Sequence, residues 1–204
     1  MKIDKKKFIY LISPNQITGR FYQDLDKILK TGKVSFFQMR LKKYSLNQKI
    51  FIGKKIKKIC KKHDVKFLIN DNPLLTKKIN ADGCHLGQGD MNIIDAKKII
   101  PNKIIGITCH NSIRLAKKAV KNKASYLAFG AFFLTKTKKV KYSAKIKILK
   151  EVRKITKTPI VAIGGINNSN YKKLLLNNSN FLAMSSYVWN NKRYKPLKTI
   201  EMLK

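Results

Sequence analysis

Cysteine, acidic residues and long apolar runs are all scarce in this 204-residue sequence. The three cysteines, Cys60, Cys84 and Cys109, are odd in number and include no Cys-x-x-Cys pair, which argues against a disulfide framework and a zinc site. No stretch approaches the ~18 apolar residues of a membrane helix, and the apolar run at 8–12 is too short for the core of a signal peptide. We therefore expect a cytoplasmic protein with reduced thiols and no membrane segment.

Negative charge is especially scarce, with 10 Asp and Glu against 46 Lys and Arg and a net charge of +36. Such a field attracts nucleic acid, membrane surfaces and phosphorylated metabolites alike. Most of the excess is lysine in a chain rich in Ile and Asn, which is typical of an AT-rich coding bias, whereas base-reading proteins favour arginine. We expect no specific nucleic-acid partner and keep a Lys-rich nucleic-acid-binding protein as an alternative function.

Short apolar runs bounded by turn residues alternate with helix-like segments along the chain. This alternation predicts parallel strands with right-handed crossovers, and eight strands are the number that closes a barrel. An open doubly wound sheet is the competitor, but no Gly-x-Gly-x-x-Gly turn follows the first run. We predict an α/β fold with a single (β/α)8 TIM-barrel domain over residues 1–204. The expected strands cover residues 8–13, 35–40, 66–70, 82–87, 103–108, 126–130, 159–165 and 181–186.

The helix-like segment at 48–62 has an apolar face that includes Ile52 and Ile56, and lysines on the opposite face. Basic amphipathic helices occur at membranes and in partner recognition, but the interpretation we favour is an outer helix packed on the sheet. Other helices are expected to start near Pro73 and after Ser112.

Polar residues stand where the expected strands end, and the carboxyl ends of all strands in a barrel meet on one face. The alternation after the second strand sends Gln38, Arg40 and Lys42 to one side, which predicts a cationic rim. This face is therefore the candidate active site. Further strand ends supply Asn70 and Asp71, Gln88 and Asp90, Thr108 and His110, and Thr135, Lys136, Thr137 and Lys138.

Two carboxylates, Asp71 and Asp90, face several cations in this arrangement. Mg²⁺ binds carboxylate oxygens and keeps phosphate oxygens of a substrate, while Arg and Lys neutralise the remaining charge. Paired carboxylates also cleave glycosides by acid/base chemistry, but nearby cations favour ionised carboxylates, and either Asp alone is commonly a helix cap. Their joint position predicts a Mg²⁺ and diphosphate site.

A second anion site is predicted where the last two strands end. Gly164 and Gly165 follow the seventh strand, and Ser185 and Ser186 follow the eighth. Backbone N–H groups at these strand ends form the usual phosphate site of such barrels. The sequence thus indicates two phosphate-bearing ligands.

The chain resembles the thiamine phosphate synthase family from Tyr10 to Trp189. The order and spacing of its motifs match that family. These motifs are Gln38-x-Arg40-x-Lys42, Asn70-Asp71, ADGCHLGQ at 81–88 followed by Asp90, Thr135-x-Thr137-Lys138, and IGGI at 163–166.

The resemblance implies a Mg²⁺-dependent transferase. Its reaction joins 4-amino-2-methyl-5-(diphosphooxymethyl)pyrimidine to a carboxylated thiazole phosphate and gives thiamine phosphate, diphosphate and CO₂. No covalent nucleophile is needed, because cations stabilise the departing diphosphate. The implied catalytic residues are Arg40, Lys42 and Lys138. The implied metal ligands are Asp71 and Asp90. The implied substrate contacts are Gln38, Arg40, Lys42, Asn70, Thr108 and Lys138 for the pyrimidine diphosphate, Thr135 and Thr137 for the thiazole carboxylate, and Gly165, Ser185 and Ser186 for the thiazole phosphate.

Departures from the family pattern keep a second enzyme open. Leu41 stands where the synthase commonly has Glu, and Thr108 where it commonly has Ser. A thiazole tautomerase of the same superfamily is the alternative, for which His110 would be the residue of interest, but both aspartates favour the synthase because a tautomerase has no diphosphate to hold. We interpret Cys84, Cys109 and His85 as structural. The sequence leaves open whether the chain forms a homodimer.

Overall fold

The computed structural model describes residues 6–134 and 142–203. Strands and helices alternate from the first described strand to the eighth, as the apolar runs predict. The strands are β1 (Ile9–Ile12), β2 (Val34–Met39), β3 (Lys66–Asn70), β4 (Gly83–Leu86), β5 (Ile104–His110), β6 (Tyr126–Gly130), β7 (Ile160–Ile163) and β8 (Phe181–Met184). The helices are α1 (Phe21–Lys30), α2 (Leu46–Lys62), α3 (Pro73–Ile79), α4 (Ile93–Ile99), α5 (Ile113–Lys121), α6 (Lys147–Ile155), α7 (Tyr171–Leu175), α8 (Ser186–Trp189) and α9 (Pro196–Glu201).

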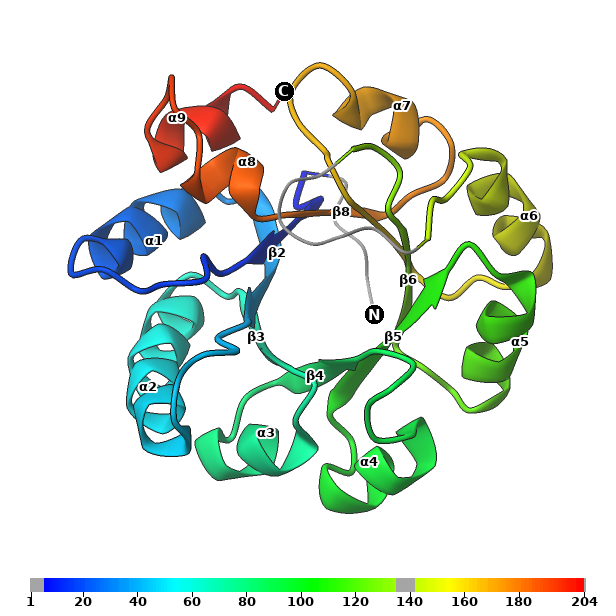
Figure 1. Cartoon of the computed structure of the whole chain (residues 1–204), viewed down its shortest axis with the longest axis horizontal. Helices are drawn as coiled ribbons and strands as arrows, with labels where there is room; N and C mark the ends of the chain where they lie inside the picture. Colours follow the sequence, from blue (N-terminus) through cyan, green and yellow to red (C-terminus); the bar gives the residue numbers. More distant parts are fainter. Residues whose placement is uncertain (1–5, 135–141, 204) are drawn as a thin grey trace.

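The strands form a closed parallel barrel in the order β1 to β8, with the helices arranged around it (Figure 1). Closure comes from β8, whose Leu182 pairs with Ile9 of β1. The predicted (β/α)8 TIM barrel is therefore confirmed. The prediction of a single domain over all of residues 1–204 includes segments outside the described residues and stays a prediction.

The strand ends differ from the predicted ones for local reasons. β7 stops at Ile163 because Gly164 and Gly165 have φ values of +104° and +64°, which leave the extended region. β8 stops at Met184 because Ser186 already begins α8. His110, expected just beyond the fifth strand, is instead the last residue of β5 and pairs with Phe129 across an irregularity in the register.

Alternation along each strand divides the apolar residues between two cores. Outward side chains such as Ile9 and Leu11 pack in the large core shared with the helices. Inward side chains such as Tyr10, Phe36 and Tyr126 fill the barrel itself. Because these side chains fill the barrel, no open channel runs along its axis within the described residues. The polar residues at the carboxyl ends of the strands therefore lie above a packed interior.

Local capping explains where several helices begin. Ser45 and Gln48 form a reciprocal capping box at the start of α2. Ile52 and Ile56 of α2 are buried, which confirms an outer helix packed on the barrel. The predicted starts at Pro73 and after Ser112 are confirmed as well.

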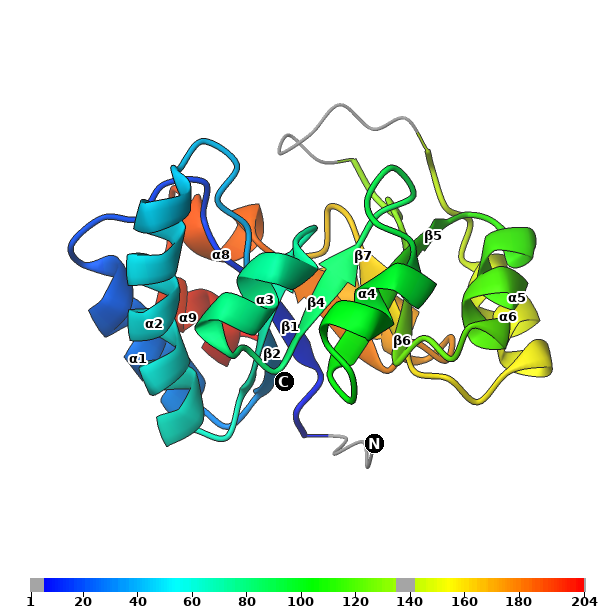
Figure 2. The ribbon, with the colours of Figure 1, turned by 90° about the horizontal axis from the view of Figure 1, so that it is seen from below.

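The connections that follow the strands lie on one side of the barrel. Figure 2 shows the connection from β2 to α2 on the side opposite the connection from α2 to β3. This side carries the polar strand ends. Within residues 6–134 and 142–203, no helix is both long enough and apolar enough to cross a membrane.

Candidate active site

The end of β2 supplies a polar and cationic rim. The side-chain nitrogen Nε2 of the buried Gln38 donates a hydrogen bond of 3.0 Å to Oδ1 of Asn70, at the end of β3. The backbone N–H of Arg40 donates to Oγ of Ser13 at 2.9 Å, which fixes the chain just after β2. The Nζ atom of Lys42 lies 3.9 Å from Oδ2 of Asp71. The structure thus brings together the predicted residues of β2 and β3.

Asp71 is held in an unusual backbone conformation beside the barrel mouth. Its φ is +64°, and its N–H donates a hydrogen bond of 2.8 Å to the carbonyl oxygen of His85 on β4. Burial, together with the hydrogen bond and charge of Asp90, raises the pKa of Asp71 to about 6, although Lys42 and Arg40 act in the opposite direction. The two carboxyl groups are therefore close neighbours, as the strand order predicts.

Neither aspartate caps a helix. Asn72 caps α3 by accepting from the N–H of Leu75, and Asn92 caps α4. Oδ2 of Asp90 instead accepts a hydrogen bond of 2.7 Å from the N–H of Gly87, which closes the turn after β4. The alternative interpretation of Asp71 and Asp90 as helix caps is therefore wrong.

The donor set of this carboxylate pair fits Mg²⁺. A cation between Asp71 and Asp90 would neutralise the repulsion that contributes to the raised pKa of Asp71. The described part of the chain contains no group of three His, Cys, Asp or Glu side chains arranged to hold a metal. Mg²⁺ is often bound by one or two carboxylates and completed by phosphate oxygens and water, so two carboxylates suffice.

A chain of hydrogen bonds runs through the barrel to Thr108. The hydroxyl groups of Tyr10 and Tyr126 are 2.8 Å apart, and the Tyr126 hydroxyl is 2.9 Å from Nδ1 of His85. Nε2 of His85 is 2.8 Å from Oγ1 of Thr108. Burial lowers the pKa of His85 to about 4, so its imidazole is neutral at neutral pH.

The sequence analysis predicts that Thr108 contacts substrate and that His85 is a structural residue. It does not predict the hydrogen bond between them. A signal was available in the alternation of β4 and β6, which points His85 and Tyr126 into the barrel. A buried Tyr or His on an inward position requires a hydrogen-bond partner. The identity of that partner depends on the shear of the barrel and could not be read from one sequence.

The residues predicted to bind a phosphate follow the ends of β7 and β8. Ile163 pairs with Ala183, so Gly165 and Ser185 each follow this pair by two residues at the same edge of the barrel. The carbonyl oxygen of Gly165 accepts a hydrogen bond of 3.0 Å from Nδ2 of Asn170. A Cβ atom on Gly165 would lie 2.3 Å from the carbonyl oxygen of Leu134, so glycine is required for this close approach.

Ser185 and Ser186 have different local roles. The Ser185 hydroxyl donates to the carbonyl oxygen of Ser13 at 3.1 Å, which links the end of β8 to the end of β1. Ser186 is the first residue of α8. Thr135, Thr137 and Lys138, predicted to complete the site, lie outside the described residues.

His110 lies beside a polar hollow of about 660 Å³ at the end of β5. Its ring stacks on Tyr142 with 4.1 Å between the ring centroids, and its φ is +52°. Gln88 also lines the hollow, and its Nε2 donates to the carbonyl oxygen of Thr108. This contact joins the loop after β4 to β5 next to the carboxylate pair.

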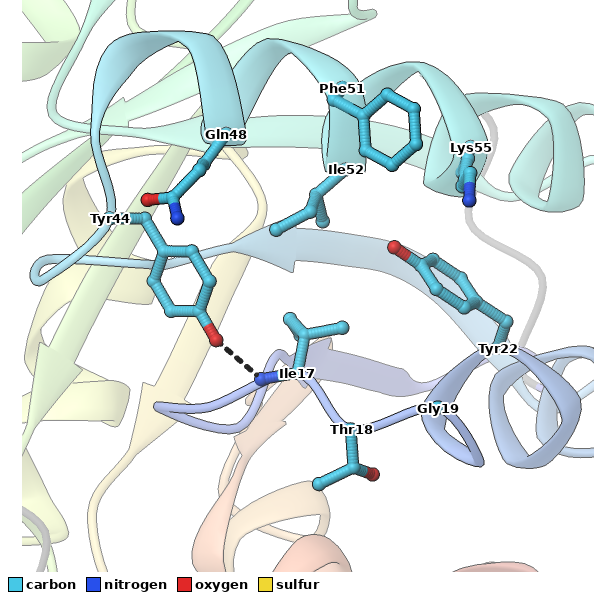
Figure 3. Close-up of a pocket in the computed structure, with 9 residues that line it drawn as sticks. All are labelled: Ile17, Thr18, Gly19, Tyr22, Tyr44, Gln48, Phe51, Ile52 and Lys55. Atoms are coloured by element: carbon cyan, nitrogen blue, oxygen red, sulfur yellow. Dashed lines mark hydrogen bonds between the residues drawn. The ribbon is translucent and has the colours of Figure 1, made fainter.

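A smaller hollow of about 290 Å³ lies between α2 and the loop after β1 (Figure 3). The Tyr44 hydroxyl accepts a hydrogen bond of 2.8 Å from the N–H of Ile17, and the Nζ atom of Lys55 lies over the ring of Phe51. Tyr44 belongs to the same loop as Arg40 and Lys42. The hydrogen bond across this hollow therefore holds the cationic rim against the loop after β1.

Comparison with known proteins agrees with this arrangement. The family model described as thiamine monophosphate synthase matches residues 9–188. The thiamine-phosphate synthase of Pelagibacter ubique (strain HTCC1062) is 67% identical over 200 residues, covering 98% of this chain and 97% of that protein. The thiamine-phosphate synthase of Erythrobacter litoralis (strain HTCC2594) is 38% identical over 186 residues, covering 89% and 87%.

A solved structure supports the same assignment. Thiamine phosphate pyrophosphorylase from Pyrococcus furiosus superposes with a TM-score of 0.86 at 29% sequence identity, covering 98% of this chain and 94% of that chain. The sequence similarity extends over the strands that carry the carboxylate pair, the cationic rim and the end of β8. The chain therefore belongs to the thiamine monophosphate synthase family.

Proposed function

We propose that the barrel mouth formed by β2, β3 and β4 is where this chain carries out the reaction of its family. The chain is a transferase that joins a pyrimidine methyl diphosphate to a carboxylated thiazole phosphate and forms thiamine phosphate, diphosphate and CO₂. The observation that supports this location is the pair Asp71 and Asp90, which lies beside Lys42 and Arg40.

The pyrimidine diphosphate is proposed to bind along the rim. Gln38 and Asn70 fix each other's amide groups, so the remaining donor and acceptor of each are oriented before the ligand arrives. Arg40 and Lys42 lie where they can neutralise the diphosphate as it leaves, which lowers the barrier to breaking its bond to the pyrimidine methyl group. Thr108, on β5, is proposed to line the same site, and Lys138 is proposed to contact the diphosphate as well.

We assign Mg²⁺ to Asp71 and Asp90. When bound there, Mg²⁺ supplies positive charge to the diphosphate oxygens. The chain contributes the two carboxylates. The carboxylate of Asp90 is oriented by the N–H of Gly87. The backbone of Asp71 is fixed by the hydrogen bond from its own N–H to the carbonyl oxygen of His85, which favours a preformed site.

The thiazole phosphate is proposed to bind between β7 and β8. Gly165, Ser185 and Ser186 stand at these strand ends, where backbone N–H groups of such barrels bind phosphate. Thr135 and Thr137 are proposed to face the thiazole carboxylate. We further propose a cytoplasmic location, which the free and buried cysteines support, no specific nucleic-acid partner, and a homodimer as the assembly to test.

The test is diphosphate release by the purified protein given both substrates, with and without Mg²⁺, while thiamine phosphate is followed. We expect metal-dependent release with matching product, and loss of both in Asp71→Ala. Asp24→Ala, an aspartate on α1, is the matched control and should keep activity. Full activity of Asp71→Ala would overturn the metal assignment. Turnover of a thiazole isomer without the pyrimidine substrate would instead favour the tautomerase.

A further inference from the structure

The hydrogen-bond chain from Tyr10 to Thr108 has a direction that can be worked out by counting protons. Each of the three hydroxyl groups carries one proton, and a neutral imidazole carries one N–H. The chain contains three contacts, so three of these four protons are used within it. The fourth proton therefore belongs either to Tyr10 or to Thr108, the two ends of the chain. Tyr10 is buried, whereas Thr108 is partly exposed.

In one direction, the protons all point towards the barrel mouth. Tyr10 donates to Tyr126, Tyr126 donates to Nδ1 of His85, and the Nε2–H of His85 donates to Oγ1 of Thr108. The proton left over belongs to Thr108, which is partly exposed at the end of β5. Every proton inside the barrel then has an acceptor.

In the opposite direction, the unused proton belongs to Tyr10. Tyr10 is 2% exposed, and its hydroxyl has no second hydrogen-bond partner among the residues that the structure describes. A protonated imidazole gives the same result, because both ring nitrogens donate and Tyr126 must then donate to Tyr10. A buried proton without an acceptor costs about 1 to 3 kcal/mol, so both arrangements are disfavoured.

We propose that Tyr126 and His85 are positioning residues that present the Thr108 hydroxyl to the barrel mouth as a hydrogen-bond donor. His85 has the Nε2–H tautomer in this arrangement. The Thr108 proton is then available to an acceptor atom of the ligand, either a ring nitrogen or a phosphate oxygen. This ligand assignment rests on the proposed function, whereas the tautomer does not.

The tautomer can be measured without substrate by long-range ¹H–¹⁵N NMR of protein labelled at its 3 histidines. The variants His63→Asn and His110→Asn assign the signals by elimination. We expect Nδ1 of His85 to resonate as an unprotonated ring nitrogen and Nε2 as a protonated one. An Nδ1–H tautomer or an imidazolium in the wild-type protein at neutral pH overturns the proposal.

The functional consequence is tested by a double-mutant cycle on kcat/KM. Thr108→Val removes the donor with little change in shape, and Tyr126→Phe removes the group that orients His85. We expect each single change to lower kcat/KM by about fivefold to tenfold, and Tyr126→Phe to cause no further loss in the Thr108→Val background. Losses that multiply in the double variant overturn the positioning role, because an effect through stability alone does not depend on the Thr108 hydroxyl.

Tyr10→Phe is the matched control, since it also removes one buried hydroxyl but leaves Tyr126 able to donate to His85. It should keep the Nε2–H tautomer and lose less kcat/KM than Tyr126→Phe. An equal loss of kcat/KM in the two variants contradicts the proposal. A wild-type protein with the expected tautomer but no synthase turnover counts against the proposed function instead.

Discussion

Replacing Asp71 by Asn should make the metal-free protein more stable at neutral and alkaline pH. Burial and Asp90 raise the pKa of Asp71 from 3.8 to about 6. When the pKa of a carboxyl group is higher in the folded state than in the unfolded state, the free energy of unfolding falls as the pH rises from the unfolded-state pKa to the folded-state pKa. At about 1.4 kcal/mol per pKa unit the full penalty is about 3 kcal/mol. Because the side chain is 34% exposed, screening should reduce the penalty to about 1 to 2 kcal/mol.

Urea unfolding with a chelator present measures this penalty. At pH 8 we expect Asp71→Asn to exceed the wild type in free energy of unfolding by about 1 to 2 kcal/mol. At pH 4, Asp71 is protonated in the folded wild type and partly protonated in the unfolded chain, so most of the difference should disappear. With Mg²⁺ at pH 8, the wild type should gain more stability than the variant, because metal binding to the folded state alone raises its stability.

Asp26→Asn is a control for which the free energy of unfolding should change in the opposite direction. Hydrogen bonds from His63 and Lys62 lower the pKa of Asp26, so its charge stabilises the folded state at pH values above its ordinary pKa. Both substitutions raise the net charge by one and share any general effect of charge on this basic chain. If Asp71→Asn is destabilised at pH 8 as Asp26→Asn is, burial and Asp90 do not oppose the ionisation of Asp71 as the structure implies.

Four further outcomes are expected. Asp90→Asn should keep the hydrogen bond from Gly87, since an amide oxygen can accept it, and should lose Mg²⁺-dependent turnover in the diphosphate assay. Gly165→Ala should lower the free energy of unfolding by at least about 1 kcal/mol because of its positive φ, and should raise KM for the thiazole phosphate. Tyr44→Phe should lower the free energy of unfolding by about 1 kcal/mol and raise KM for the pyrimidine diphosphate, since it frees the loop that carries the cationic rim. Binding to a DNA duplex should be weak and should disappear as salt rises, whereas tight binding with retained affinity at physiological salt would favour the nucleic-acid alternative.

The barrel was predictable because its signals are local and repeated. Each strand is a run of apolar residues that is too short for a typical helix, and turn residues bound it. The predicted helix starts near Pro73 and after Ser112 are also local signals, because the side chains of Asn72 and Ser112 cap those helices. The predicted ends of β7 and β8 were less accurate. The positive φ values of Gly164 and Gly165 end β7, and the start of the short helix α8 ends β8.

The site was predictable to the extent that the fold itself gathers strand ends. Gln38, Asn70, Asp71 and Asp90 needed only a parallel barrel to become neighbours. The link between His85 and Thr108 depends on which inward side chains meet across the barrel, which is a property of register and packing. Contacts of this kind become visible only when all strands are placed together.

Scarcity of negative charge is more informative about this chain than its excess of lysine. Asp82 accepts a hydrogen bond from the N–H of Phe67, and Asp26 and Asp95 are bound by donors that lower the pKa of each carboxyl group. These aspartates stabilise the fold that surrounds them. Asp71 differs, because burial and Asp90 oppose its ionisation even with Lys42 at 3.9 Å. A folded chain that retains such a carboxylate gives up stability at that position, and a bound cation would recover it.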